Sequence, residues 1–166
     1  MPFIRPKEIS GDDVQDYPVM VHALKELEKT TKDKVDYLVL LRPTSPMRPA
    51  GLIERAIDII ESDSRLTSVR SVVESTEHPY RQWCLHDNYM IGVENKIFEP
   101  YNIPRQKLLK TYFQSGDIEL IKRSTILSGS ISGCRVAPLI LDHGQMLDID
   151  NESDLAIAKI KMANDA

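Results

Sequence analysis

The chain has 166 residues, of which 42% are hydrophobic and 28% are charged. These values are typical of one soluble globular domain and argue against intrinsic disorder. The net charge is −4, with 21 basic and 25 acidic residues mixed along the chain, so no basic block indicates a nucleic-acid partner.

The cysteine content and the N-terminal residues exclude further classes of protein. Cys84 and Cys134 are too few and too far apart for a disulfide scaffold or a zinc site. No long apolar run begins the chain, so we expect neither a signal peptide nor a membrane span. We therefore expect a cytoplasmic protein.

The first half of the chain alternates helical and strand patterns. Acidic residues at 12–16 precede an apolar helical stripe that ends near Leu27 and is followed by lysines, the order that the helix dipole favours. An apolar strand at 37–41, an amphipathic helix at 52–60 and an alternating strand at 67–73 follow. This order predicts a parallel sheet flanked by helices.

The middle of the chain interrupts that alternation. Residues 83–93 predict a hairpin around an Asp-Asn turn. A proline-containing loop then leads to a basic stretch at 105–110. We therefore expect a single domain, 1–166, in which about 78–114 form an inserted flap or pairing arm. The later elements are predicted to be strands at 117–122 and 135–141 and a helix at 154–163.

A proline-rich junction after the first strand carries candidate binding groups. The segment Arg42-Pro43-Thr44-Ser45-Pro46-Met47-Arg48-Pro49 has prolines that fix φ and withhold amide donors, which predicts a stiff loop. Open α/β sheets bind ligands at the carboxyl ends of their strands. Arg42 and Arg48 are suited to carboxylates or phosphates. A surface turn with solvated arginines is the alternative.

A second group of polar residues precedes the last predicted helix. Asp148 and Asp150 are two residues apart and project to the same side of an extended segment. Such carboxylates suit Mg²⁺ together with substrate phosphates. The alternative is helix capping by Asp150 or Asn151, with Asp154 in the first turn. Capping leaves Asp148 without an explanation.

Four segments in this order resemble one family. Residues 40–48, His78-Pro79-Tyr80-Arg81, Arg105-Gln106 and 147–155 are similar to the acylneuraminate cytidylyltransferases, which make CMP-activated nonulosonic acids such as CMP-sialic acid. The resemblance spans essentially the whole chain. It implies a three-layer α/β nucleotidyltransferase (Rossmann-like) sheet flanked by helices, with an inserted β-hairpin flap. It also implies attack of a 2-keto sugar acid on the α-phosphate of CTP, with pyrophosphate as the leaving group.

The resemblance assigns roles to three residues near the expected ligand edge. Asp148 and Asp150 match the family's Mg²⁺-binding acids, and Arg42 and Asp150 are its implied catalytic residues. Many relatives have a sugar-contacting glutamine where this chain has Arg42. An arginine there is able to pair bidentately with the sugar's carboxylate.

Further substrate-binding positions follow from the same resemblance. Thr44 and Ser45 match the substrate-side loop, and Arg81, Arg105 and Gln106 match positions on the flap. In the family the flap forms a homodimer, so we expect a homodimer here. Solvated or interface charge is the alternative for the two arginines.

Two departures from the family pattern are visible. The chain has no Gly/Arg/Lys-rich loop to hold the CTP phosphates, so we expect a sheet incomplete at its N-terminus. A non-catalytic module that keeps the sugar-side and dimer surfaces is the alternative. Ser115-Gly116-Asp117-Ile118-Glu119 replaces the family's Asn-Gly-Ala-Ile-Tyr. Asp117 and Glu119 are either contacts to an amino-bearing sugar or strand-end charges.

Overall fold

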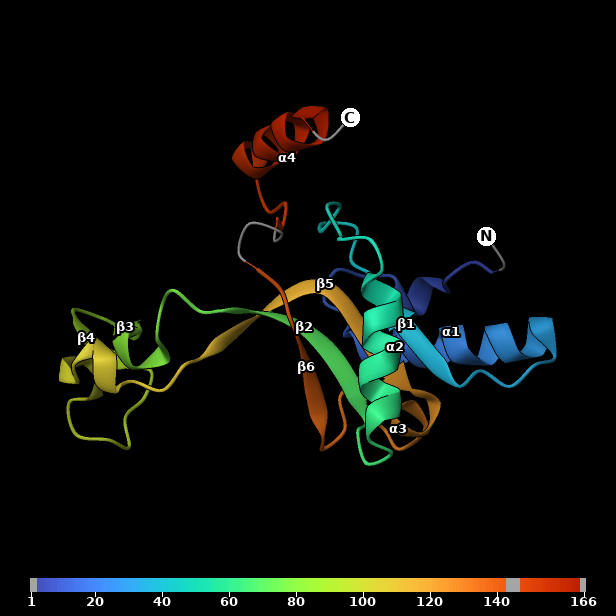
Figure 1. The fold of residues 1–166 in the computed structure, drawn as a ribbon, viewed down its shortest axis with the longest axis horizontal. Coiled ribbons are helices and arrows are strands. Elements are labelled where there is room, and N and C mark those ends of the chain that lie inside the picture. Colours follow the sequence, from blue (N-terminus) through green and yellow to red (C-terminus); the bar gives the residue numbers. More distant parts are fainter. Residues whose placement is uncertain (1–2, 143–146, 165–166) are drawn as a thin grey trace.

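A mixed four-stranded sheet forms the centre of the molecule (Figure 1). The computed structural model describes residues 3–142 and 147–164. The sheet has the order β1-β5-β2-β6, with β1 at Tyr37–Leu40, β5 at Tyr112–Lys122, β2 at Ser68–Glu74 and β6 at Val136–Ile140. Strands β2 and β6 are parallel, and β5 runs antiparallel to both β1 and β2. The expectation of an all-parallel sheet is therefore wrong for β5.

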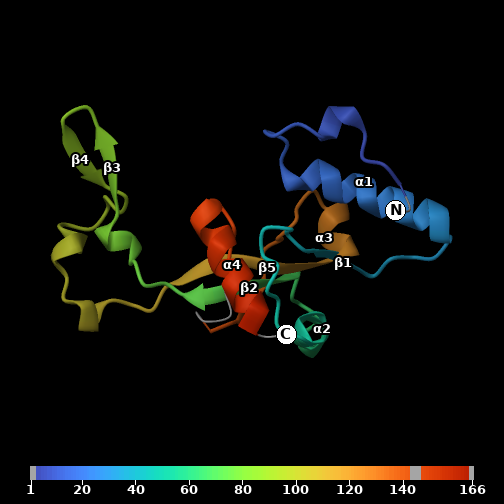
Figure 2. The ribbon, with the colours of Figure 1, turned by 90° about the horizontal axis from the view of Figure 1, so that it is seen from above.

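Helices cover both faces of this sheet. Helix α1 (Asp16–Thr31) and the short α3 (Arg123–Leu127) lie on one face, and α2 (Leu52–Ser62) lies on the other (Figure 2). Because the sheet lies between these two layers, the expected three-layer α/β architecture is confirmed. Helix α3 was not predicted, because it is too short to show a helical period in the sequence.

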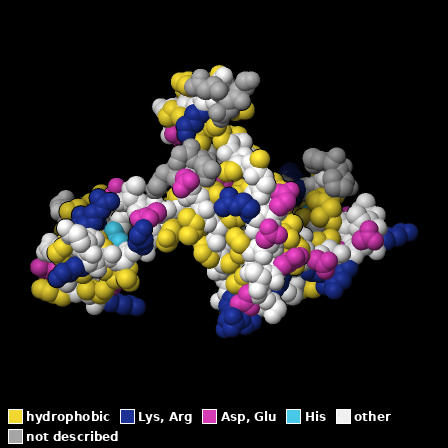
Figure 3. Space-filling view, viewed as in Figure 1, with side chains coloured by type: hydrophobic (Ala, Val, Ile, Leu, Met, Phe, Trp, Pro, Cys, Tyr) yellow, Lys and Arg dark blue, Asp and Glu magenta, His cyan; other side chains and the backbone are white. Residues whose placement is uncertain are grey.

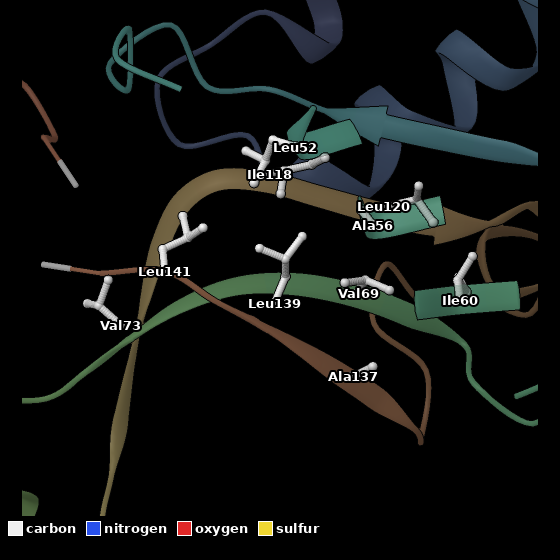
Figure 4. Close-up of a cluster of buried hydrophobic side chains, with 10 residues drawn as sticks. All are labelled: Leu52, Ala56, Ile60, Val69, Val73, Ile118, Leu120, Ala137, Leu139 and Leu141. Atoms are coloured by element: carbon white, nitrogen blue, oxygen red, sulfur yellow. The ribbon is translucent and has the colours of Figure 1, made fainter. Parts of the chain in front are cut away.

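Two apolar cores hold the layers together. Beneath α2, apolar residues spaced four apart on the helix meet one face of the sheet (Figure 4). This core consists of Leu52, Ala56, Ile60, Val69, Val73, Ile118, Leu120, Ala137, Leu139 and Leu141. On the other face, the second core consists of Met20, Leu24, Leu38, Ile121 and Ile126.

An arm extends from the sheet between β2 and β5 (Figures 1 and 2). It contains the hairpin of β3 (Trp83–His86) and β4 (Tyr89–Gly92), as predicted, with Asp87 in the turn at φ 51°. Three 3-10 turns complete it: η2 (Pro79–Arg81), η3 (Pro100–Asn102) and η4 (Arg105–Lys107). Figure 3 shows hydrophobic side chains gathered on the arm.

The two ends of the described chain carry the remaining elements. A 3-10 turn, η1 (Lys7–Ile9), precedes α1, and α4 (Glu152–Asn164) stands apart from the sheet in Figure 1. Across the residues that the structure describes, no helix combines the length and the apolar character needed to cross a membrane.

Candidate functional site

Residues 42–49, here called the proline loop, lie against the segment Asp148–Asp150. The amide of Ile149 donates a hydrogen bond to the main-chain oxygen of Thr44 at 2.9 Å. Because β1 and β2 both run antiparallel to β5, and β6 is parallel to β2, the carboxyl ends of β1, β2 and β6 share one edge of the sheet. The proline loop leaves β1 at this edge, where α/β sheets bind ligands.

Strand β5 forms the floor under the loop. Gly116 adopts φ 75°, and a Cβ added there would lie 3.5 Å from Arg42 Cδ and 3.6 Å from Ser45 Oγ. The loop therefore packs directly on the strand at this point. Ser45 and Asp117 are each 1% exposed, and Ser115 is 2% exposed. Polar groups so deeply buried are expected to be hydrogen-bonded.

Arg48 fastens the loop to the strand. Its Nε donates to the main-chain oxygen of Asp117 at 2.7 Å, and its Nη2 donates to the main-chain oxygen of Arg42. These bonds give Arg48 a structural role, so the alternative of an idle, solvated arginine is wrong for this residue.

Arg42 belongs to a partly buried ion-pair network centred on the buried carboxylate of Glu119. Its Nη2 donates to Asp16 Oδ2 at 2.6 Å and to Glu119 Oε1 at 3.0 Å. Glu119 is 1% exposed; its other oxygen lies 2.9 Å from Arg70 Nη2, and Gln114 Nε2 donates to Oε1 at 3.3 Å. The hydrogen bond to Asp16, with a smaller effect from Glu119, raises the pKa of Arg42 against the opposing effect of burial.

This network bears on two expectations from the sequence. Glu119 is neither a strand-end surface charge nor a free group facing a sugar, because Arg42 and Arg70 both pair with it. Arg42 donates both hydrogen bonds through Nη2. A hydrogen bond to the carboxylate of a sugar would therefore come from Nη1 or Nε. The role of Arg42 in substrate binding stays a prediction.

Asp117 lies in an unusual environment for a carboxyl group. Burial raises its pKa above the ordinary value, and the charge of Asp148 adds to that shift, while Ser115 and Arg48 oppose it. Its Oδ2 has no hydrogen-bond partner among the described residues, and the same holds for Asp148 Oδ1 and Ser45 Oγ. From the sequence, Asp117 was predicted to be either a contact to an amino-bearing sugar or a strand-end charge, and no pattern linked it to Asp148.

The two acids predicted to bind Mg²⁺ occupy different environments. Asp148 is half-buried, whereas Asp150 is exposed and its amide donates to Asp154 Oδ2 at 3.1 Å. Asn151 Oδ1 accepts from the Asp154 amide at 3.0 Å, and Asp154 Oδ2 accepts from the Asn151 amide at 3.2 Å. This reciprocal pair is a capping box, so Asn151 caps α4. Among the described residues no group of three or more His, Cys, Asp or Glu is placed to hold a metal ion.

The predicted flap residues lie on the arm. Arg81 is exposed, and its Nη2 donates to the Ile103 main-chain oxygen at 3.4 Å. Gln106 is exposed in η4. Arg105 lines a cavity of about 380 Å³ with Tyr112 and the end of β6. Arg105 thus borders the ligand edge of its own sheet, while Arg81 and Gln106 are not brought to the proline loop.

Comparisons with known proteins support the fold. The sequence matches no protein-family model and no curated protein. A similar solved structure is that of CMP:2-keto-3-deoxy-manno-octonic acid synthetase complexed with CTP. The TM-score is 0.55 at 12% sequence identity, over 86% of this chain and 68% of that one. At such low identity the likeness concerns the fold alone, and this chain has the nucleotidyltransferase-like fold of that synthetase.

Proposed function

We propose that this chain is a CTP-dependent cytidylyltransferase that transfers CMP to an acidic 2-keto sugar with release of pyrophosphate. The observation that carries the proposal is the contact between Thr44 and Ile149, which joins two distant motifs at the ligand edge. The likeness in fold to a synthetase of a CMP-linked sugar acid, solved with CTP, supports the same reaction class. The acceptor we propose is a nonulosonic, sialic-acid-like sugar, as in the acylneuraminate family.

Binding roles follow from the groups that are available. Arg42 is held in place by two carboxylates and pairs through Nη1 or Nε with the carboxylate of the sugar. Thr44 and Ser45 form the loop beside Arg42. Arg105, which lines the cavity at the end of β6, neutralises negative charge of the bound substrates. These contacts position the acceptor, which is the main requirement of phosphoryl transfer.

The residues present fit a Mg²⁺ ion at Asp148. Its Oδ1 is buried without a hydrogen-bond partner among the described residues, and a carboxylate oxygen is a preferred ligand of Mg²⁺. Asp150 is exposed on the same segment and lies beside the capping box of α4. When bound, the ion supplies neutralisation of the charge on the triphosphate.

The arm is the surface we assign to homodimer formation. Leu85, Phe98 and Leu109 on it are 82%, 90% and 83% exposed. Large exposed apolar groups gathered on a protruding element mark an interaction site. A second copy of the chain is the partner that we propose.

An assay with CTP, Mg²⁺ and a panel of 2-keto sugar acids tests the function. We expect pyrophosphate release and a CMP-sugar detected by mass spectrometry. Asp148→Asn is expected to lower the rate by about 10²-fold or more, because it removes a ligand of the charge-neutralising ion. Asp58→Asn, an exposed change on α2, is the matched control and should keep full activity. Absence of any CMP-sugar with the whole panel would leave the non-catalytic module as the better description.

A further inference from the structure

Buried oxygen atoms without hydrogen-bond partners gather where the proline loop meets β5. In the part of the chain that the structure describes, Asp117 Oδ2, Asp148 Oδ1, Ser45 Oγ and Ser115 Oγ have no hydrogen-bond partner. Ser45 and Asp117 are each only 1% exposed. Native proteins rarely leave buried oxygens unsatisfied, and a buried carboxylate without compensation is costly. These oxygens are therefore available to bind a ligand.

Three elements bring these atoms to one place. Ser45 Oγ lies 3.6 Å from the Cβ position of Gly116, the residue before Asp117 on β5. The bond from Ile149 to Thr44 puts the residue after Asp148 against the residue before Ser45. Asp148 also acts electrostatically on Asp117. The loop, the strand and the segment before α4 thus converge.

The surrounding charges do not balance the two carboxylates. Arg48 is the cation whose charge acts on Asp117. Its Nε and Nη2 are hydrogen-bonded to the main-chain oxygens of Asp117 and Arg42, not to either carboxylate. The single positive charge of Arg48 does not balance the two carboxylates of Asp117 and Asp148. The site is therefore negatively charged, and its available ligand atoms are oxygens. Hard divalent cations such as Mg²⁺ and Mn²⁺ prefer such ligands.

We propose that Asp117, Asp148 and Ser45 bind a divalent cation, with Asp117 rather than Asp150 as the second carboxylate. Asp150 is exposed and lies beside the capping box of α4, whereas Asp117 is buried near Asp148. Water or substrate phosphates complete the coordination shell. The site deepens the proposed function, because Asp148 belongs to both, but it is tested without turnover.

Mn²⁺ binding to the intact chain, measured by electron paramagnetic resonance without nucleotide, tests the site. The wild-type chain is expected to bind Mn²⁺ at one site. Asp117→Asn and Asp148→Asn should each weaken the affinity at least tenfold, and Ser45→Ala should weaken it several-fold. Asp150→Asn, the matched control on the same segment, should stay within twofold of wild type.

Thermal unfolding separates loss of the site from loss of the fold. Asp117→Asn replaces a buried carboxylate by an amide of the same shape, so without Mn²⁺ its melting temperature should equal or exceed that of wild type. Mn²⁺ should raise the melting temperature of wild type and Asp150→Asn, but not that of Asp117→Asn. Wild-type affinity in Asp117→Asn, or no Mn²⁺ binding by wild type, would overturn the proposal. A chain that binds Mn²⁺ as expected but forms no CMP-sugar would contradict the proposed function and leave the cation site standing.

Discussion

Individual side chains near the ligand edge divide into those with partners and those without. Glu119 pairs with Arg42 and Arg70, which come from a loop and a different strand. Asp117, two residues earlier on β5, has an unpartnered oxygen within the described chain. The sequence shows two acids of one kind here. Burial and distant partners, which only the fold supplies, give one a structural role and the other a proposed ligand role.

Glu119→Gln tests the structural role of this carboxylate. The change removes one charge from a site 1% exposed and leaves two guanidiniums facing a neutral amide. Breaking a buried ion pair from one side costs roughly 3–5 kcal/mol, and the partial exposure of Arg42 favours the lower end, about 3 kcal/mol. Urea unfolding measures the loss. Glu8→Gln, an exposed change in η1, should stay within about 0.5 kcal/mol of wild type. Equal stability of the two variants would show that the network contributes little.

At the scale of elements, α1 is tied to α3 by one ion pair. Arg123 Nε and Nη2 donate to Glu28 Oε1 and Oε2 at 2.6 and 3.1 Å, and the Val35 amide donates to Oε1 at 3.2 Å. The hydrogen bonds from Arg123, more than any other contact, lower the pKa of Glu28. One carboxylate therefore fixes a helix, the following loop and the start of α3.

The lowered pKa of Glu28 gives a pH-dependent contribution to stability. A depressed carboxyl pKa stabilises the folded chain above the unfolded value, about 4.3 for glutamate, and this contribution is lost as the pH falls through the folded value. The melting temperature of Glu28→Gln should be below that of wild type at pH 7, and the gap should close as the pH drops below about 4. Glu54→Gln on α2, an exposed change, should show no such convergence. A gap that stays constant with pH would assign the loss to packing instead.

Sequence patterns predicted the elements with a clear period and missed those without one. The apolar spacing of Leu52, Ala56 and Ile60 gave α2, and the Asp87 turn gave the hairpin. The alternation in β5 marks a strand but carries no direction, so its antiparallel pairing was not predictable. Arg42 and Glu119 are 77 residues apart in the chain, and no local pattern reports such a pairing. The meeting of the loop with Asp148 followed only from family order.

At the scale of the whole molecule, the arm has little of its own core. Trp83 and Tyr101 pack at 4.4 Å between ring centroids, and a cavity of about 580 Å³ opens beside them. The sheet carries both apolar cores, so the arm gains little burial within one chain. A two-stranded hairpin is only marginally stable by itself in water. Covering the arm with a second copy would supply the burial that it lacks.

Serine substitutions on the arm test this assembly. The combined change Leu85→Ser, Phe98→Ser and Leu109→Ser removes three side chains that are 82–90% exposed in one chain, so it costs the monomer little. We expect wild type to sediment as a dimer at micromolar concentration and the triple variant as a folded monomer. Leu127→Ser, at a residue 58% exposed on α3, is the matched control away from the arm and should remain dimeric. A few large side chains usually contribute most of the binding free energy of an interface, so losing three of them shifts the equilibrium strongly towards the monomer. A wild-type chain that is monomeric at all concentrations, or a dimeric triple variant, would contradict this role for the arm.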